Sequence, residues 1–307
     1  MNSLILSSPL PLDQNAAAVY IASLPAETGR RTQAQALRVV ASILNTSPDS
    51  LNWGALRYQH TAMIRSQLSQ SYSPATANKI LSALRQTLKQ AWLLGQMDVD
   101  DYMKAIELEP VTGDTLPAGR ELSQGEILAL ITACKADHSP AGTRDAAIIG
   151  MMYAAGLRRE EVVSLSLSSY DPETGKLTLT GKRSKQRTAY ISGGAQTALN
   201  AWLAIRGSDT GALFVWVDKK GKISAFDHLS PQAVYNTLIK RAQEAGVKNF
   251  SPHDMRRTFI SHLLSAGADI ATVSKMAGHA NVQTTARYDR RPEEARRKAA
   301  ELLHVPY

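Results

Sequence analysis

The N-terminal third of the chain places apolar residues at helical spacing in four segments separated by short polar breaks. These segments are residues 12–24, 31–44, 53–70 and 73–95. The last is the best marked, because Ser73 can cap it, Pro74 suits its first turn and Gly95 suits the position after its end. The pattern predicts an all-helical domain of four or five helices over residues 1–110.

Residues 109–120, EPVTGDTLPAGR, interrupt this pattern with two Pro, two Gly and no periodicity. Such a composition is typical of a segment that connects two domains. We therefore place a linker at residues 111–120 and a second domain at residues 121–307.

The second domain begins with helical patterns and then changes its period. Ser123 and Glu126 have capping-box spacing at a helix start, and residues 143–156 continue with helical spacing. Apolar and polar residues then alternate on both sides of a basic loop, which predicts a hairpin around residues 176–191, and residues 212–216 read as a further short strand.

Helical patterns return at Ser230 and Ser251, each followed by Pro, and a charged helix is expected from about residue 292. The expected fold class is therefore mostly α with a small β-sheet, an α+β catalytic domain joined to an all-α bundle.

Charge is concentrated in the second part of the chain. Residues 1–110 carry 9 Lys and Arg against 8 Asp and Glu, whereas residues 111–307 carry 26 against 19, so +7 of the net +8 lies there. A basic domain of this kind favours a polyanion, and nucleic acid is preferred to an acidic membrane because no amphipathic membrane helix is apparent. The first cation is Arg30, so the basic start of a signal peptide is missing and a cytoplasmic, nucleoid-associated protein is expected.

Two helix starts in this basic part carry groups that suit phosphate chemistry. Ser251 is a natural N-cap, and His253 and Arg256, three apart, share the face of the first turn, where helix N–H groups attract anions. Arg158 and Glu161 have the same spacing at a second helix start. Each pair alone is better explained as a solvated, charged helix turn.

Two further fragments add cations, an imidazole and a phenol. The hairpin tip holds Lys182, Arg183, Lys185 and Arg187. Such a tip can reach a nucleic-acid groove or present a lysine proton donor, although a solvated turn is an equal alternative. Near the end, His279 precedes Tyr288, and Arg287 beside that tyrosine would help to stabilise a phenolate nucleophile. The residues alone do not distinguish Tyr288 from the nine other tyrosines, most of which are expected to be packing residues.

The ordered combination of these fragments resembles the tyrosine recombinase/integrase family, which includes Xer and Cre proteins and phage integrases. Its boxes read GLRREE, GKRSKQR, PHDMRRTF, AGH and ARY here. Departures from the usual pattern are Ala155, Arg183 and Ala277, and none of them removes a reactive group. The first domain resembles the helical core-binding domain of the family in character only.

The resemblance implies a role for each box. Tyr288 would attack a DNA phosphodiester to form a 3′-phosphotyrosyl link, with Arg158 and Arg256 clamping the non-bridging oxygens. The remaining assignments are His253 for removal of the tyrosine proton, His279 for donation to the phosphate, Lys185 for protonation of the leaving 5′-oxygen and Glu161 for orientation of the arginines. Further DNA contacts are expected from Lys182, Arg183, Arg187, Arg257 and Arg287, although Arg257, about 100° round the helix from Arg256, could instead be structural.

The same resemblance implies partners and excludes cofactors. Because the phosphotyrosyl link keeps the bond energy, religation needs no ATP, and neither a metal nor another cofactor is expected. The partners would be double-stranded DNA with paired recombination sites, further copies of the chain in a tetramer docked through the C-terminal helix, and an accessory DNA-bending or directionality factor. The alternatives are DNA relaxation of the type IB topoisomerase kind and a catalytically silent DNA-binding protein.

Replacement of Lys185 by Ala should abolish most DNA cleavage, because an unprotonated 5′-oxygen is a poor leaving group. A substrate with a better 5′ leaving group should restore adduct formation in this variant, as measured by the covalent protein–DNA band on a denaturing gel. An equally inactive variant on both substrates would contradict the general-acid role.

Overall fold

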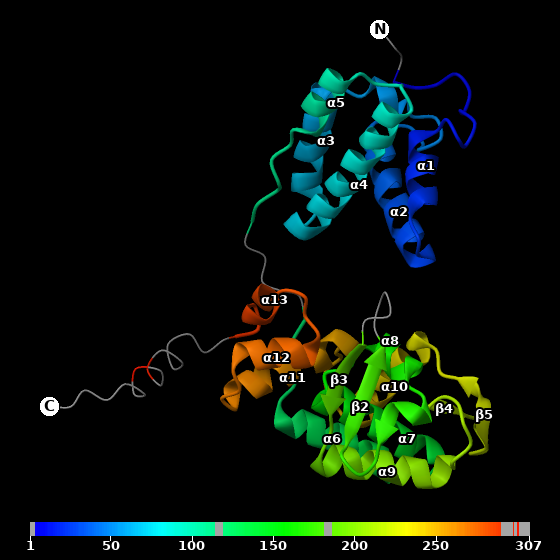
Figure 1. Cartoon of the computed structure of the whole chain (residues 1–307), viewed down its shortest axis with the longest axis vertical. Helices are drawn as coiled ribbons and strands as arrows, with labels where there is room; N and C mark the ends of the chain where they lie inside the picture. Colours follow the sequence, from blue (N-terminus) through cyan, green and yellow to red (C-terminus); the bar gives the residue numbers. More distant parts are fainter. Residues whose placement is uncertain (1–3, 114–118, 181–185, 290–296, 298–299, 301–307) are drawn as a thin grey trace, which may run out of the picture. The chain divides into compact units, whose positions relative to one another are not determined.

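The computed structural model describes residues 4–113, 119–180, 186–289, 297 and 300, and the chain divides into two units between residues 117 and 118. The first unit contains five α-helices among its described residues (Figure 1). They are α1 (Ala16–Ser23), α2 (Glu27–Ile43), α3 (Tyr58–Ser71), α4 (Pro74–Leu93) and α5 (Val99–Ile106), with a short 3-10 turn at Trp53–Ala55. The expected all-helical character of this unit is confirmed.

Helix α4 is the centre of the first unit. It contacts α1, α2, α3 and α5, and it buries Leu81, Leu84 and Leu88 completely. Its apolar positions recur at three and four residues, which is the spacing that aligns side chains on one helical face. The sequence period therefore accounts directly for the core of this unit.

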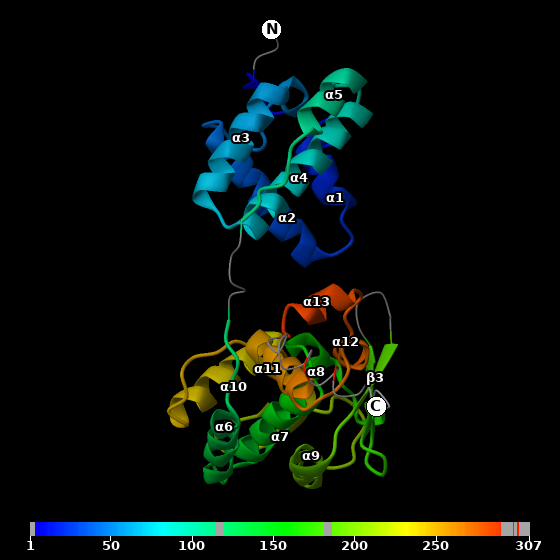
Figure 2. The same ribbon diagram turned by 90° about the vertical axis from the view of Figure 1, so that its left-hand side faces the viewer.

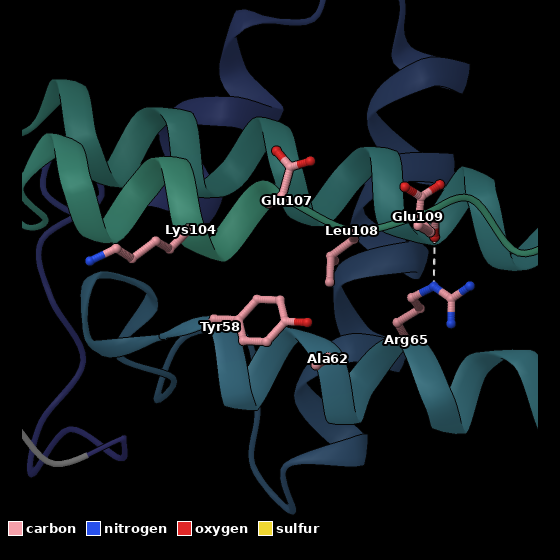
Figure 3. Close-up of a pocket in the computed structure, with 7 residues that line it drawn as sticks. All are labelled: Tyr58, Ala62, Arg65, Lys104, Glu107, Leu108 and Glu109. Atoms are coloured by element: carbon pink, nitrogen blue, oxygen red, sulfur yellow. Dashed lines mark hydrogen bonds between the residues drawn. The ribbon is translucent and has the colours of Figure 1, made fainter.

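The chain that leaves α5 is bonded back onto the bundle. Arg85 Nη2 donates to Leu108 O at 2.6 Å, and Arg65 Nε donates to Glu109 O at 2.6 Å. The side-chain amide of Asn78 forms two hydrogen bonds of 2.8 Å with the backbone of Val111, one as donor and one as acceptor. Figure 3 shows the Arg65 contact at the edge of a 680 Å³ cavity, lined on one side by Lys104 and Glu109 and on the other by α3. These bonds hold the first residue of the expected linker against the first unit.

The described residues of the second unit form helices and two small antiparallel sheets. Its helices are α6 (Gln124–Ala136), α7 (Pro140–Ala154), α8 (Arg159–Ser164), α9 (Gly193–Arg206), α10 (Pro231–Glu244), α11 (Pro252–Ser265), α12 (Ile270–Ala277) and α13 (Val282–Ala286). Its strands are β1 (Tyr170–Asp171), β2 (Lys176–Thr180), β3 (Gln186–Tyr190), β4 (Val215–Val217) and β5 (Ile223–His228).

The predicted hairpin is present as β2 and β3, which pair antiparallel with Leu177 opposite Ala189 and Leu179 opposite Arg187. Strand β1 adds to the β2 edge, whereas β4 pairs with β5, a strand that the sequence analysis did not predict. Helix α7 packs against α6, α9 and α11, and the views agree that α12 and α13 gather beside α11 (Figures 1 and 2). The expected helix from about residue 292 lies outside the described residues, apart from positions 297 and 300, which are helical.

The start of the second unit is fixed by Arg120. Its backbone N–H donates to Asp254 Oδ1 at 2.9 Å, and its guanidinium donates to Lys248 O at 2.5 Å. Nearby, Leu122 N donates to the Thr258 hydroxyl at 2.9 Å. These contacts attach the incoming chain to the start of α11. In the part of the chain that the structure describes, no helix is long and apolar enough to cross a membrane.

A buried ion-pair network joins three helices of the second unit. Arg241 on α10 is fully buried and donates to Asp145 on α7 at 2.7 Å and to Asp137, just after α6, at 2.6 Å. Arg144 donates to the other oxygen of Asp145 at 2.8 Å. Removing one member of such a network leaves a buried charge without its partner.

We therefore expect Arg241→Met to lower the free energy of unfolding of the second unit by about 3–5 kcal/mol. The matched control is Lys240→Met on the same helix, because Lys240 is 56% exposed and its ion pairs are 3.6 Å and 3.9 Å long. The Lys240→Met substitution should lower the free energy of unfolding by less than about 1 kcal/mol. Urea unfolding followed by circular dichroism measures both, and equal losses would contradict the network's role.

Candidate active site

Three arginine side chains meet at the carboxyl end of α12. Arg187 Nη1 donates to Met276 O at 2.6 Å, Arg256 Nη2 donates to Ala277 O through a short contact, and Arg158 Nη2 lies 3.5 Å from Gly278 O. The last carbonyls of a helix have no partner within the helix and carry partial negative charge, so they attract cations. Gly278 ends α12 in the left-handed conformation, with φ at +66°.

Arg256 is the most deeply placed of the three, with 2% of its surface exposed. Its Nη1 donates to Gly156 O at 2.8 Å, so two backbone carbonyls from different parts of the chain fix its guanidinium. Burial and then the neighbouring charge of Arg158 lower the pKa of Arg256 to about 10. The side chain is still protonated at neutral pH, and an anion beside it would relieve the unfavourable electrostatics.

Glu161 on α8 connects two of the arginines. Its Oε1 accepts from Arg158 Nη1 at 2.9 Å, and its Oε2 accepts from Arg187 Nη2 at 2.8 Å and from the Arg158 backbone N–H at 2.9 Å. Burial raises the pKa of this carboxyl, but the hydrogen bonds from Arg187 and Arg158 outweigh it and the net shift is downward. Glu161 is therefore an ionised, buried partner of both arginines.

His253 and Tyr288 lie within hydrogen-bond distance of each other. His253 Nε2 is 3.0 Å from Tyr288 Oη, which allows the phenol O–H to donate to an unprotonated Nε2. Burial, followed by the positive charges of Arg256 and Arg257, lowers the pKa of His253 below its ordinary value. The imidazole is thus kept neutral at pH 7, the form that can accept a proton.

The start of α11 confirms the predicted local geometry around His253. Ser251 is the N-cap, its hydroxyl accepts from Asp254 N, and Pro252 is the first helical residue. Asp254 Oδ2 accepts in return from Ser251 N at 2.8 Å, which completes a capping box. This cap holds the first turn, and with it His253 and Arg256, in place.

His279 follows Gly278 and faces the same tyrosine. The ring centroids of His279 and Tyr288 are 6.3 Å apart, with 23° between the planes. His279 Nδ1 lies 2.8 Å from the hydroxyl of the fully buried Thr285, which orients the ring. Burial, then the charges of Arg256 and Arg158, lowers the pKa of His279 to about 4.

A 350 Å³ cavity opens beside these groups. Its lining includes Arg158, His253 and Arg256, together with Arg159 and Tyr235. Three guanidiniums and an imidazole around one small cavity suit a phosphate group, because guanidiniums bind its oxygens in a fork. The larger cavity of Figure 3 lies in the first unit and contains none of these residues.

The structure thus brings together Arg158, Glu161, His253, Arg256, His279 and Tyr288, as the sequence analysis expected. Lys182, Arg183 and Lys185 lie outside the described residues, and Arg287 is exposed.

Two of the expected DNA contacts are placed differently. Arg187 is bonded to Glu161 and Met276 O rather than extending from the hairpin. Arg257 is 5% exposed, with its guanidinium 5.3 Å from the Tyr288 ring centroid and 3.8 Å from Asp254, which favours the structural role left open for it.

Sequence reasoning missed Thr285 and Asp254 as supporting residues. The spacing of Ser251 and Asp254 resembles a capping box and could have revealed Asp254. Thr285 gave no signal, because its contact with His279 depends on how the chain folds between them.

This geometry is that of enzymes that use a tyrosine to cleave and rejoin DNA strands, and comparisons with known proteins agree. The model of the phage integrase family matches residues 120–294. The chain therefore belongs to the phage integrase family of tyrosine recombinases.

Named relatives support this assignment. The tyrosine recombinase XerC of Alcanivorax borkumensis is 34% identical over 71% of this chain and 70% of its own length. The tyrosine recombinase XerD of Caulobacter vibrioides is 33% identical over 70% of each chain.

Solved structures share the fold at low sequence identity. The Tn1549 transposon integrase in complex with transposon right end DNA matches with a TM-score of 0.70 and 14% identity, over 96% of this chain and all of the other. The XerH site-specific recombinase bound to its palindromic difH substrate matches with a TM-score of 0.64 and 19% identity, over 94% and 79%.

The depressed pKa of His279 predicts a loss of stability at acid pH. The folded state binds a proton on His279 less well than the unfolded chain does. The stabilisation that the neutral His279 gives the folded state is therefore fully present above about pH 6.5 and is lost as the pH falls toward about 4. We expect His279→Asn to lose less stability than the wild type between about pH 7.5 and about pH 5, measured as urea midpoints. The exposed His138→Asn is the control and should follow the wild type, whereas identical curves for all three proteins would contradict the prediction.

Proposed function

We propose that this tyrosine recombinase is a site-specific DNA recombinase whose nucleophile is Tyr288, acting through a 3′-phosphotyrosyl intermediate. The observation that carries the proposal is the 3.0 Å contact of Tyr288 Oη with His253, beside a cavity lined by Arg158 and Arg256. A nucleophile, a neutral base and two cationic clamps are the parts that phosphodiester transfer needs.

In the proposed step, Tyr288 Oη bonds to phosphorus while the bond from phosphorus to the 5′-oxygen breaks. The phenol proton passes to His253 Nε2, and Lys185 gives a proton to the leaving 5′-oxygen. Arg158 and Arg256 neutralise the charge that develops on the non-bridging oxygens, and His279 donates to the same phosphate. Attack by a 5′-hydroxyl from the partner strand reverses the step and releases Tyr288, so no cofactor or metal is required.

The proposed assembly has two DNA sites and four copies of the chain. The N-terminal helical unit is proposed to bind core DNA, with Lys182, Arg183 and Arg287 as further DNA contacts. The segment from about residue 292 is proposed as the helix that docks on a neighbouring copy, and an accessory DNA-bending or directionality factor could set the outcome. A protein with this substrate would work at the nucleoid, in the cytoplasm.

The second candidate activity is DNA relaxation of the type IB topoisomerase kind, which uses similar residues. A plasmid with two target sites distinguishes the two activities. Recombination inverts or deletes the segment between the sites, whereas relaxation changes only the linking number. The similarity to Xer recombinases favours strand exchange.

Replacement of Tyr288 by Phe removes the attacking oxygen and should abolish covalent protein–DNA adducts. DNA binding should stay close to that of the wild type, because the cationic clamp is unchanged. A nicked suicide substrate followed on a denaturing gel measures the adduct, and a mobility shift measures binding. Tyr190→Phe, which alters an exposed tyrosine of β3, is the control and should form adducts normally. Adducts that persist in Tyr288→Phe would overturn the assignment.

A further inference from the structure

Arg187 lies on β3 and was expected to contact DNA from the basic hairpin. In the structure its side chain is 15% exposed, and both terminal nitrogens are used within the protein. Nη2 donates to Glu161 Oε2 at 2.8 Å, and Nη1 donates to Met276 O at 2.6 Å. Figure 2 shows β3 beside α12, so Arg187 joins the hairpin to the carboxyl end of that helix.

The stem of Arg187 packs against Gly278. A Cβ atom added at Gly278 would lie 2.8 Å from Arg187 Cδ, which is closer than two carbon atoms can pack. The absence of a side chain at position 278 therefore makes room for Arg187 next to His279. This explains a requirement for glycine at this position in addition to its positive φ.

The position of Arg158 depends on Glu161. The Arg158 side chain is 43% exposed, and its closest side-chain partner among the described residues is Glu161 Oε1 at 2.9 Å, with Gly278 O farther away at 3.5 Å. Glu161 is 6% exposed, so its carboxylate is stable in this position only while cations satisfy it. Arg187 is the better buried of the two cations that do so.

From these contacts we infer that Arg187 is a positioning residue for DNA cleavage. It holds the Glu161 carboxylate against the end of α12, and Glu161 in turn holds the Arg158 guanidinium at the phosphate cavity. The inference rests on the proposed cleavage reaction and assigns to Arg187 a role within the protein, in place of a contact with the DNA groove. A lysine could not substitute, because one ammonium cannot reproduce a planar fork between a carboxylate and a carbonyl.

The test is a double-mutant cycle between Arg187 and Arg158 in single-turnover cleavage of a suicide substrate at saturating DNA. Arg158→Ala should slow cleavage about 10²–10³-fold, as expected for loss of a transition-state donor. Arg187→Ala should slow it about 10–100-fold, as expected for loss of a residue that orients a reactive group. In the Arg158→Ala background, adding Arg187→Ala should reduce the cleavage rate by less than about threefold further, because the effect of Arg187 passes through Arg158.

DNA affinity provides a second readout that a groove contact would change. A positioning role leaves the dissociation constant and its salt dependence near those of the wild type. Loss of a phosphate contact would instead weaken binding and reduce the salt slope by about 1. The matched control is Lys176→Ala, which removes an exposed cation from the other strand of the same hairpin and should keep the wild-type cleavage rate.

Arg187→Lys covers the case in which Arg187→Ala does not fold, since it keeps the charge and the stem, and we expect a similar loss of rate. The inference would be overturned if the two reductions in cleavage rate multiply in the double variant. It would also be overturned if Arg187→Ala binds DNA more weakly but cleaves it at the wild-type rate. Failure of the proposed function is distinguishable, because it would appear as an absence of adducts in the wild type itself.

Discussion

The site depends on the way in which α12 ends. Three successive carbonyls, those of Met276, Ala277 and Gly278, accept from three arginines that come from β3, α11 and the start of α8. Like charges at this density repel one another, and the partial negative charge of a helix carboxyl end together with Glu161 offsets that repulsion. Because Gly278 turns the chain at this point, the same end also places His279 beside the Tyr288 ring.

This arrangement prepares the site electrostatically before any substrate is bound. Burial, and after it the neighbouring cations, hold the pKa values of His253 and His279 down, so both imidazoles are neutral at pH 7. A neutral His253 can accept a proton from Tyr288. A bound phosphate would place a negative charge beside the buried Arg256, whose guanidinium donates to two neutral backbone carbonyls. Groups fixed in this way need little rearrangement during the reaction, which is the usual origin of electrostatic catalysis.

The features that could be read from the sequence are the local ones. The Ser251 cap, the first turn at Pro252 and the β2–β3 hairpin all follow from neighbouring residues, and the structure confirms them. The order of the five boxes indicated the proposed reactive residues through resemblance to a family. Strand β5 was missed because residues 223–228 carry no clear alternation of apolar and polar positions.

The supporting contacts could not be predicted, because they join distant parts of the chain. Arg187 reaches Glu161 across 26 positions and Met276 across 89, and Arg158 reaches Gly278 across 120. A basic residue on a hairpin looks like a DNA contact until the fold shows what lies beside it. The same holds for Arg257, whose burial under the Tyr288 ring depends on the return of the chain after α13.

The most direct test of the central claim is a crystal structure of the protein with duplex DNA and vanadate, which mimics the five-coordinate phosphorus of the transition state. We expect vanadium bonded to Tyr288 Oη, its equatorial oxygens held by Arg158 and Arg256, and the three arginines still bonded to the end of α12. Vanadate bound away from Tyr288 would contradict its role as nucleophile, and arginines that leave the α12 carbonyls to reach vanadate would contradict a site prepared before substrate binds.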